Sequence, residues 1–405
     1  MIDPRRLSVC YVAPGQDLLS SSGPSRNVLN LARALSEFAD VTVAFHRIAD
    51  PEPPKDIRVL EIDPPMQART LDDAAMRGIG YGQFAGFLRR LTRFVDEDLK
   101  RYDIVLEKSW LLSGFVASRC QRRRQLGVAV ENIVPNVRHA AQRSMAKLLR
   151  LRIGRWLAGR NLRRVPLVIA ETDFLKAEIA SHWHVRPDRI AVVGLGVDHQ
   201  LFHPADGADA RLRLGFAAGP LALVYVGVLD RTHNLAPVIE ALLGAADDGV
   251  QLHIVGDGPL SADYRRQAGA SARIVFHGRV PHHDVPLYIA AADLCLAPYD
   301  AAAFTSGELG YSTMKIPEYM ASGRAVASVP TGRIGALIAD GVSGYLFPND
   351  AAHWARFLQR PPTRERLREM GAAAARVRLP TWSDTAQGYL SACRAILQNS
   401  TGLER

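Results

Sequence analysis

The chain has 405 residues, of which 48% are hydrophobic and 22% charged, as in an ordinary soluble globular protein of two or three domains. No apolar run reaches the roughly 18 residues that span a membrane, and residues 1–6 lack the apolar core of a signal peptide, so we expect a cytoplasmic protein. The four cysteines are far apart and show neither disulfide nor metal spacing.

The formal net charge of +9 lies wholly in the first half of the chain. Residues 1–200 hold 31 Lys and Arg against 22 Asp and Glu, whereas residues 201–405 hold 19 of each. A basic stretch from Arg138 to Arg164 has no acidic residue and includes Trp156 among several leucines. Such a stretch suits an anionic membrane surface, and a solvated helical face is the alternative. Nucleic acid also attracts such charge, but no nucleic-acid motif is present, so we expect no nucleic-acid partner.

The first half alternates strands with helices. Apolar runs typical of buried parallel strands occupy residues 7–13, 41–45, 103–106, 128–130, 165–170 and 190–193. Helical patterns occupy residues 28–35, 81–99, 115–120 and 174–180. The proline-broken segment 51–65 is expected to lie on the surface.

The same alternation restarts at residue 221. Strands are predicted over residues 221–226, 251–255, 274–276, 294–297, 325–329 and 344–347. Two such series predict an α/β protein with two Rossmann-like domains, residues 1–199 and 200–380, whose parallel sheets face an interdomain cleft. Ligands of such sheets bind outside the carboxyl ends of the strands.

Residues 314–323 read as a short helix after a polar loop, stopped by a glycine before a buried strand. Lys315 and Glu318 are three apart and share one face near the helix start. A helix N-terminus favours anions, the lysine adds positive charge, and the carboxylate can accept hydrogen bonds from two sugar hydroxyls. The pair suits a nucleoside diphosphate with its ribose, and an amphipathic helix with a surface Lys/Glu pair is the alternative.

This segment resembles the nucleotide-sugar site of the retaining glycosyltransferases of family 4 (glycosyltransferase group 1), which have the GT-B fold. The likeness extends over residues 221–348, and the first half matches in layout. The resemblance implies that Glu318 holds the ribose and that Lys315 lies near the diphosphate. It also implies that residues 1–199 form the acceptor domain, that residues 200–380 form the donor domain, and that a helix over residues 381–398 packs back on the first domain.

A glycine turn and a second loop extend the resemblance. Gly256 and Gly258 match the family's Gly-x-Gly-Pro turn after a strand, where glycine lets a backbone approach a nucleotide. A tight strand-to-helix turn needs the same residues, so the motif gains weight only beside the others. By resemblance, Arg279 and Val280 lie where family members contact the base.

The loop from Gly227 departs from the family. The family's diphosphate-binding arginine and lysine fall on Val228 and His233, so that cation pair is missing. Arg231 is the nearest substitute, with an ordinary surface residue as the alternative, and a protonated His233 could donate a hydrogen bond.

The loop before the lysine is a second departure. The family's first glutamate, which contacts the donor sugar, falls on Gly310, and Glu308 lies two residues off register. A shifted register would make Glu308 the functional residue. Ser312 and Thr313 would present backbone N–H groups to phosphate or sugar.

The first half contributes two candidates. Gly23 resembles the family's glycine loop that reaches the donor phosphates, with a plain helix cap as the alternative. Glu131 ends a strand where many relatives have a histidine, and a carboxylate there could orient or deprotonate an acceptor hydroxyl. Capping of the next helix is the alternative for Glu131, and His139 is an alternative residue for the role.

The predicted function is a hexosyltransferase that moves a sugar from a nucleoside diphosphate donor, UDP-linked, to a hydroxyl of a glycan, glycolipid or small molecule with retention of configuration. The catalytic candidates are Glu131, Glu308 and Lys315. No metal or cofactor is expected beyond the nucleotide-sugar co-substrate. The acceptor would be a glycan or lipid-linked, with the protein peripheral on the inner face of a membrane. A GT-B nucleotide-sugar epimerase and a non-catalytic nucleotide-sugar-binding partner are the alternatives.

Overall fold

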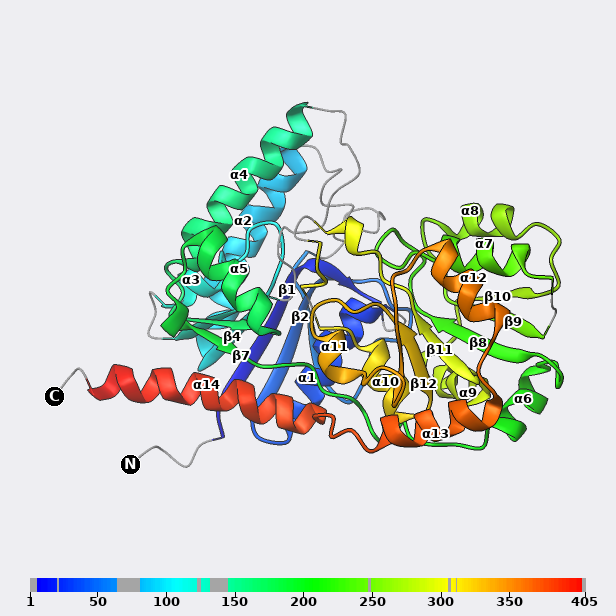
Figure 1. The fold of residues 1–405 in the computed structure, drawn as a ribbon. Helices are drawn as coiled ribbons and strands as arrows, with labels where there is room; N and C mark the ends of the chain where they lie inside the picture. Colours follow the sequence, from blue (N-terminus) through cyan, green and yellow to red (C-terminus); the bar gives the residue numbers. More distant parts are fainter. Residues whose placement is uncertain are drawn as a thin grey trace. The chain divides into compact units, whose positions relative to one another are not determined.

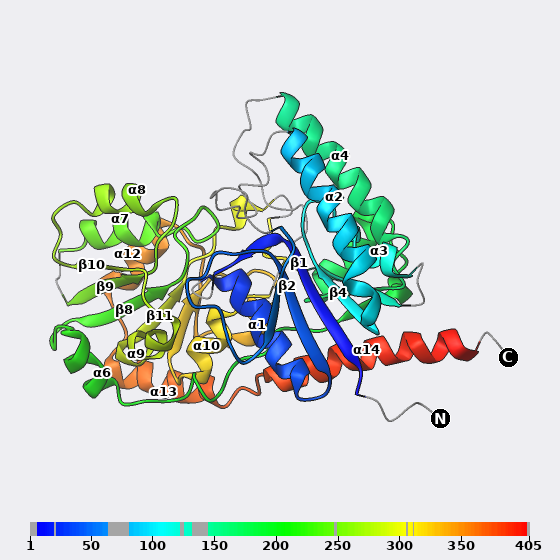
Figure 2. The ribbon, with the colours of Figure 1, turned by 180° about the vertical axis from the view of Figure 1, so that it is seen from behind.

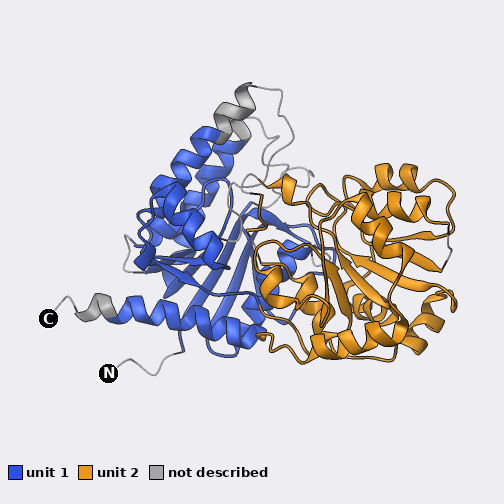
Figure 3. Ribbon diagram, in the orientation of Figure 1, with its two compact units in different colours: residues 1–135, 139–195, 382–405 blue, residues 136–138, 196–381 orange. Residues whose placement is uncertain are grey.

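The computed structural model describes residues 6–19, 22–63, 81–121, 125–131, 145–246, 249–304, 307–310 and 312–402. Arg138, Asn132 and His139 lie outside these ranges. The chain divides into two compact units (Figure 3). The first runs to Leu195 and takes up the chain again at Trp382, and the second comprises Gly196–Thr381. The expected boundaries were at 199/200 and 380/381.

In the described part of the first unit, a parallel seven-stranded sheet has the order β3-β2-β1-β4-β5-β6-β7. Its strands are β1 (Ser8–Leu18), β2 (Asp40–Ile48), β3 (Arg58–Glu61), β4 (Ile104–Lys108), β5 (Leu126–Glu131), β6 (Leu167–Ala170) and β7 (Ile190–Val192). Every residue of β4, β5 and β6 is buried, which explains their continuous apolar runs.

Two strands of this sheet differ from expectation. β1 continues to Leu18 because its pairing with β2 shifts register between Ala13 and Asp17 and then resumes. The surface segment 51–65, for which no strand was predicted, contains β3, which pairs with β2 from Thr42 opposite Arg58. β3 is an edge strand and bonds to a neighbour on one side only, so a short sequence without a strong strand pattern suffices.

The helices of the first unit are α1 (Gly23–Ser36), α2 (Tyr81–Glu97), α3 (Ala117–Cys120), α4 (Met145–Leu162), α5 (Asp173–Trp183) and α14 (Trp382–Gly402). α1 begins after Ser22, whose hydroxyl accepts a hydrogen bond from the Ser25 N–H. α14 packs against α1 (Figures 1 and 2), and Ser383 donates a hydrogen bond to Glu37 at 2.8 Å.

The second unit, in its described residues, contains a parallel six-stranded sheet of order β10-β9-β8-β11-β12-β13. The strands are β8 (Leu221–Val226), β9 (Val250–Val255), β10 (Ile274–Gly278), β11 (Leu294–Ala297), β12 (Ala325–Ser328) and β13 (Gly344–Leu346). The helices are α6 (Gly207–Leu214), α7 (Ala236–Gly244), α8 (Ser261–Ala268), α9 (Val285–Ala291), α10 (Lys315–Ala321), α11 (Ile334–Leu337), α12 (Ala351–Gln359) and α13 (Arg364–Ala375).

Two apolar cores cover the two faces of this sheet. One includes Ile289 of α9 and Tyr319 of α10, and the other includes Val238 of α7 and Trp354 of α12. The chain proceeds from β8 to β9 and β10 on one side and then returns to place β11 on the other side of β8. The strand order therefore reverses between β8 and β11, where doubly wound sheets bind ligands. Among the described helices, none is long and apolar enough to cross a membrane.

Candidate functional site

The carboxyl ends of β8 and β11 carry loops that are bonded to each other. The Asn234 N–H donates to the Pro298 carbonyl, and the Asp300 N–H donates to the Thr232 carbonyl, both at 3.0 Å. These bonds hold the two loops together at the point where the strand order reverses. The second unit therefore has a fixed loop platform where a ligand of this type of sheet would bind.

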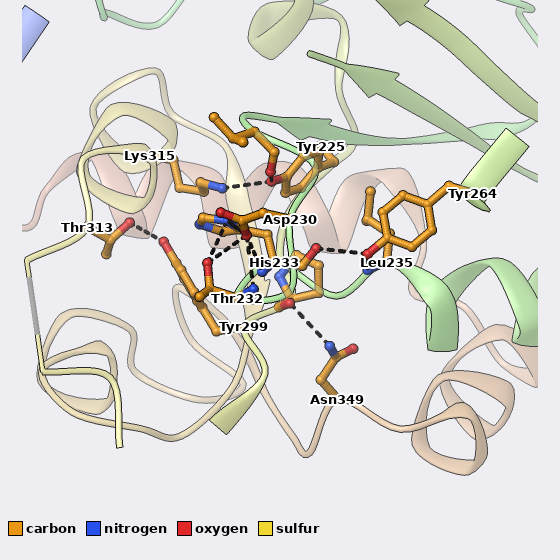
Figure 4. A network of polar contacts seen from close by, with 12 residues as sticks. Tyr225, Asp230, Thr232, His233, Leu235, Tyr264, Tyr299, Thr313, Lys315 and Asn349 are labelled. Carbon is orange, nitrogen blue, oxygen red and sulfur yellow. Dashed lines mark hydrogen bonds and ion pairs between the residues drawn. The ribbon is translucent and has the colours of Figure 1, made fainter. Parts of the chain in front are cut away.

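Lys315 lies over this platform (Figure 4). Its Nζ donates to the Tyr225 hydroxyl at 3.2 Å and lies 4.4 Å from the centre of the Tyr225 ring and 5.5 Å from that of Tyr299. Burial lowers the pKa of Lys315 to about 7, although Asp230 and Glu318 act in the opposite direction. The amino group is therefore poised between its charged and neutral forms at neutral pH.

The helix that carries Lys315 is fixed to the strand end. The Tyr319 hydroxyl accepts a hydrogen bond from the Val226 N–H at 2.9 Å and also lies 3.3 Å from the Val226 carbonyl. Because Tyr319 is buried in α10 and Val226 ends β8, this contact sets the height of the helix start over the sheet edge. Glu318 is half-buried in the first turn of the same helix.

Asp230 organises the loop after β8, a role that the sequence analysis missed. Its Oδ1 accepts hydrogen bonds from the N–H and hydroxyl of Thr232 and from the N–H and Nδ1 of His233 (Figure 4). Burial raises the pKa of Asp230, but the hydrogen bonds from His233 and Thr232 outweigh it and lower the pKa to about 2. Burial and Lys315 lower the pKa of His233 to about 4, so its imidazole is neutral at neutral pH. His233 thus brings no positive charge to the platform.

Three glycines allow the neighbouring loops to approach one another. A Cβ on Gly227, whose φ is +148°, would lie 2.7 Å from Lys315 Nζ. A Cβ on Gly256 would lie 1.9 Å from the Gly227 carbonyl oxygen, and one on Gly258 would lie 2.4 Å from the Leu229 carbonyl oxygen. These positions need glycine for loop packing whether or not a ligand is bound.

The remaining donor-site candidates of the second unit differ in exposure. Arg231 and Arg279 are exposed, and Val280 is half-buried. The electrostatic effect of Arg279 contributes to the lowered pKa of Asp257, for which hydrogen bonds from Ser261 and Gly258 are the larger causes.

The loop before Lys315 is attached at two points. Thr313 is buried and shares a hydrogen bond with the Tyr299 hydroxyl, whereas Ser312 is half-buried (Figure 4). Glu308 is exposed, and the N–H of the next residue, Leu309, donates to the Thr331 hydroxyl at 3.1 Å. The structure therefore brings Thr313, Lys315, Gly227 and His233 together around two tyrosines.

In the first unit, Glu131 ends β5 with 1% of its surface exposed. Neither of its carboxyl oxygens makes a hydrogen bond within the described residues. Burial raises the pKa of Glu131 to about 8, and the charge of Glu107 adds to the effect. The Glu131 carboxyl is therefore neutral at pH 7. Gly23 is the first residue of α1, and a Cβ there would meet nothing within 4 Å.

The sequence analysis missed the charged end of β4, which lies beside β5. Glu107 accepts hydrogen bonds from Trp110 Nε1 at 2.6 Å and from the Ala117 N–H at 2.8 Å. Burial raises the pKa of Glu107 to about 7 despite these bonds. Lys108 is 1% exposed, and its Nζ donates to Asn27 Oδ1 at 3.3 Å. The sequence signal for this charged site was an apolar strand that ends in Glu107 and Lys108.

A second missed network lies at the ends of β1, β2 and β3. His46 Nδ1 lies 2.8 Å from Asp17 and Nε2 lies 3.5 Å from Asp63, and Arg90 of α2 binds Asp63 at 2.6 Å. The Phe87 ring lies edge-on to the imidazole at 4.8 Å. This network ties α2 to the carboxyl edge of the first sheet.

The basic stretch forms α4, described from residue 145. Ile153 and Trp156 are 50% and 60% exposed, and the Arg160 guanidinium lies 5.9 Å from the Trp156 ring. Arg152, Arg163 and Arg164 are also exposed. α4 therefore presents an aromatic side chain and cations to solvent. In the part of the chain that the structure describes, no group of three His, Cys, Asp or Glu could hold a metal ion.

Two protein families match the two units in turn. The family described as Glycosyltransferase Family 4 matches residues 21–201, and the family described as Glycosyl transferases group 1 matches residues 220–360. Among curated relatives, a D-inositol 3-phosphate glycosyltransferase of Mycolicibacterium paratuberculosis is 28% identical over 247 residues, which cover 58% of this chain and 54% of the relative. The same-named protein of Frankia alni is 29% identical over 254 residues, covering 57% and 59%. The chain thus spans about half the length of the curated relatives it matches.

Solved structures match over nearly the whole chain. Anabaena Alr3699/HepE in complex with UDP and glucose aligns with a TM-score of 0.72 at 17% identity, over 96% of this chain and 99% of that one. Sucrose-phosphate synthase from Thermosynechococcus elongatus aligns with a TM-score of 0.69 at 20% identity, over 98% and 99%.

These likenesses define the class of protein: the fold is GT-B, as predicted, with one Rossmann-like sheet in each unit. The chain belongs to the group 1 glycosyltransferases of family 4, and the resemblance stated from residues 314–323 is confirmed.

Proposed function

We propose that the protein transfers a sugar from a UDP-linked donor to a hydroxyl acceptor with retention of configuration. The observation that carries the proposal is Lys315, fixed at the start of α10 over the point where the strand order reverses. A cation and helix N–H groups at that point suit a diphosphate. HepE, which shares the fold, is described in complex with UDP and glucose, and the matched curated relatives are named as glycosyltransferases.

Lys315 would stabilise the charge that builds on the leaving diphosphate, and Glu318 would hold the ribose through its carboxylate. Since His233 is neutral and Arg231 is exposed, Lys315 would be the main cation of the platform. The leaving phosphate itself would take the acceptor proton, so most of the catalysis would come from positioning.

Glu131 would act on the acceptor side. Because its pKa is about 8, the carboxyl holds its proton at neutral pH and would donate a hydrogen bond to the acceptor. It would have to lose this proton before it could act as a base. The acceptor would be a glycan, a polyol or a lipid-linked sugar. The curated relatives are named for an inositol phosphate. α4, with Trp156 and its arginines, would contact an anionic membrane surface.

The first experiment is thermal stabilisation of the purified protein by UDP, GDP, ADP and dTDP and their common sugars. UDP and a UDP-sugar are expected to raise Tm, and Glu318→Ala is expected to abolish the rise without unfolding the protein. Glu365→Ala, which removes an exposed carboxylate from the first turn of α13, is the matched control and should keep the rise.

A Tm rise with another nucleotide alone would reassign the donor. No rise with any of them, in a folded sample, would contradict donor binding by the free protein. The epimerase and the non-catalytic partner are not favoured, because the matched relatives are named as transferases. Product analysis with and without an acceptor would distinguish all three.

A further inference from the structure

A pocket of about 400 Å³ lies at the amino edge of the first sheet, opposite the carboxyl edge where Glu131 lies. It is lined at the amino ends of adjacent strands by Ser8 of β1, Asp40 of β2 and Arg58 of β3, and by Arg101 and Tyr102, which precede β4. The carboxyl edge, where Glu131 lies, is a full strand length away, or roughly 17–20 Å. A ligand here would not occupy the site proposed for the transfer reaction.

Three guanidinium groups line this pocket against one carboxylate. The Arg6 guanidinium already has protein partners, because it donates to the Ser36 carbonyl and lies 3.5 Å from the Asp40 carboxylate. Arg58 and Arg101 are exposed, and neither makes an ion pair within the described ranges. The Arg101 guanidinium lies 5.2 Å from the centre of the Tyr102 ring. The pocket therefore holds two cations without a protein anion to balance them.

The charges of both cations also act on one buried side chain near the pocket. Burial and the nearby Cys120 raise the pKa of the Cys10 thiol, and Arg101 and Arg58 both act in the opposite direction. Cys10 is buried in β1, two residues from Ser8. Both positive charges therefore act on Cys10, although they come from different strand ends.

The backbone around the pocket is fixed. Ser8 donates to the Asp103 carboxylate at 2.6 Å through its hydroxyl and at 2.8 Å through its N–H, and the Asp103 N–H donates to the Ser8 hydroxyl at 3.0 Å. These bonds tie the start of β1 to the residues just after Arg101 and Tyr102. Asp103 is engaged there and does not line the pocket.

We propose that this pocket binds the phosphate group of a small soluble molecule between Arg58 and Arg101. A guanidinium matches the geometry of phosphate oxygens, and two of them can share one dianion. The volume suits a small molecule, since such sites measure about 300–1,000 Å³. Asp40 remains paired with Arg6 and sets one wall. The pocket is a second anion site, independent of the donor platform in the other unit.

The probe is pyrophosphate, titrated by calorimetry into a Lys315→Ala variant so that binding at the donor platform is removed. The Arg58→Gln/Arg101→Gln pair is expected to weaken binding by about tenfold or more, since it removes the charged hydrogen bonds to the phosphate oxygens. The matched control is Arg89→Gln/Arg93→Gln, which removes the same charge from exposed positions on α2. The control should change binding by less than about twofold, and circular dichroism should show both pairs folded.

Absence of binding before the pocket substitutions would overturn the proposal. So would equal weakening by both pairs, which would show that only overall charge matters. A parallel sedimentation uses phosphatidylglycerol vesicles. If the Arg58→Gln/Arg101→Gln variant loses vesicle binding, relative to the control variant, and still binds pyrophosphate, the pocket binds a lipid headgroup and not a soluble ligand. In that case the proposal fails.

Discussion

The Lys315 amino group changes its charge near neutral pH, so donor binding should depend on pH. A bound diphosphate favours the protonated form, whereas the free protein holds the pKa at about 7. We expect the affinity for UDP to fall as pH rises from neutral to about 9, by up to about tenfold per pH unit, because a proton must be taken up on binding. Calorimetry in buffers of different ionisation enthalpy measures that uptake directly.

Two variants test the origin of this effect. Lys315→Ala should bind UDP more weakly with a flat profile over the same range. Arg231→Gln removes a neighbouring exposed cation and leaves Lys315 in place, so its profile should keep the slope of the unsubstituted protein. A flat profile before any substitution would contradict the role of Lys315.

Glu131 offers a case in which stability and activity should move in opposite directions. Its pKa of about 8 lies above the ordinary glutamate value of 4.5, so burial lowers the stability as pH rises from 4.5 to about 8, by about 1.4 kcal/mol per pH unit. Glu131→Gln keeps the shape of the neutral carboxyl, so its free energy of unfolding should exceed that of the unsubstituted protein at neutral pH. Urea denaturation at the two ends of this window measures the difference.

The turnover of Glu131→Gln distinguishes a role of Glu131 in proton transfer from a role without proton transfer. If the carboxyl must finally give up or take a proton, Glu131→Gln loses activity while gaining stability. Full activity in a more stable protein would show that Glu131 transfers no proton and at most donates a hydrogen bond, as the glutamine amide can.

A position can be predicted at the residue scale where the chemistry depends on local sequence. Lys315 is readable because a lysine opens a helix after a polar loop, and the structure places it on the platform. Asp230, Lys108 and His46 were not readable, because their partners are separated in sequence or, as with Asp230, depend on a loop conformation that composition leaves open. The assigned roles of all these side chains stay predictions.

At the scale of elements, the loops after β8 and β9 pack closely because both contain glycine. Gly256→Ala places a Cβ 1.9 Å from the Gly227 carbonyl oxygen at a φ of +132°, so the loop after β8 must move. We expect a loss of about 1–3 kcal/mol in the free energy of unfolding, with weaker UDP binding. Gly244→Ala is the control, since a Cβ there meets nothing within 4 Å and should change stability by less than about 0.5 kcal/mol. Equal stabilities of the two variants would contradict the packing role.

The exposed face of α4 predicts membrane binding. Trp156→Ser should reduce sedimentation with phosphatidylglycerol vesicles several-fold, because an interfacial indole is lost beside cations. Leu212→Ser removes another exposed apolar side chain, 82% accessible, from the second unit and should leave vesicle binding unchanged. If Trp156→Ser sediments like the control, α4 is a solvated face.

Elements with strong periodicity were predictable and those decided by partners were not. β4 and β5 can be recognised in the sequence as apolar runs because both their faces are buried. β3 does not, since its four residues form a strand only by pairing with β2 at the sheet edge. The extension of β1 to Leu18 likewise depends on a register shift that no local pattern encodes.

For the whole molecule, the repeated strand-helix alternation was enough to predict two parallel sheets and the GT-B class, and both are confirmed. The order of the strands within each sheet was not predicted and comes from the structure alone. Donor identity, acceptor and retention rest on a few side chains that departed from the family at Val228, His233 and Gly310, so the sequence pattern left them open.

The first unit is discontinuous in sequence, since α14 returns to it after the whole of the second unit. During synthesis, α1 therefore leaves the ribosome long before its partner helix exists. At roughly 5–20 residues per second, the interval is on the order of ten seconds or more. The second unit, which is continuous, can finish folding within it. The apolar surface that later receives Tyr389 and Leu390 stays uncovered in that time, so nascent chains should need chaperone protection until α14 has been synthesised.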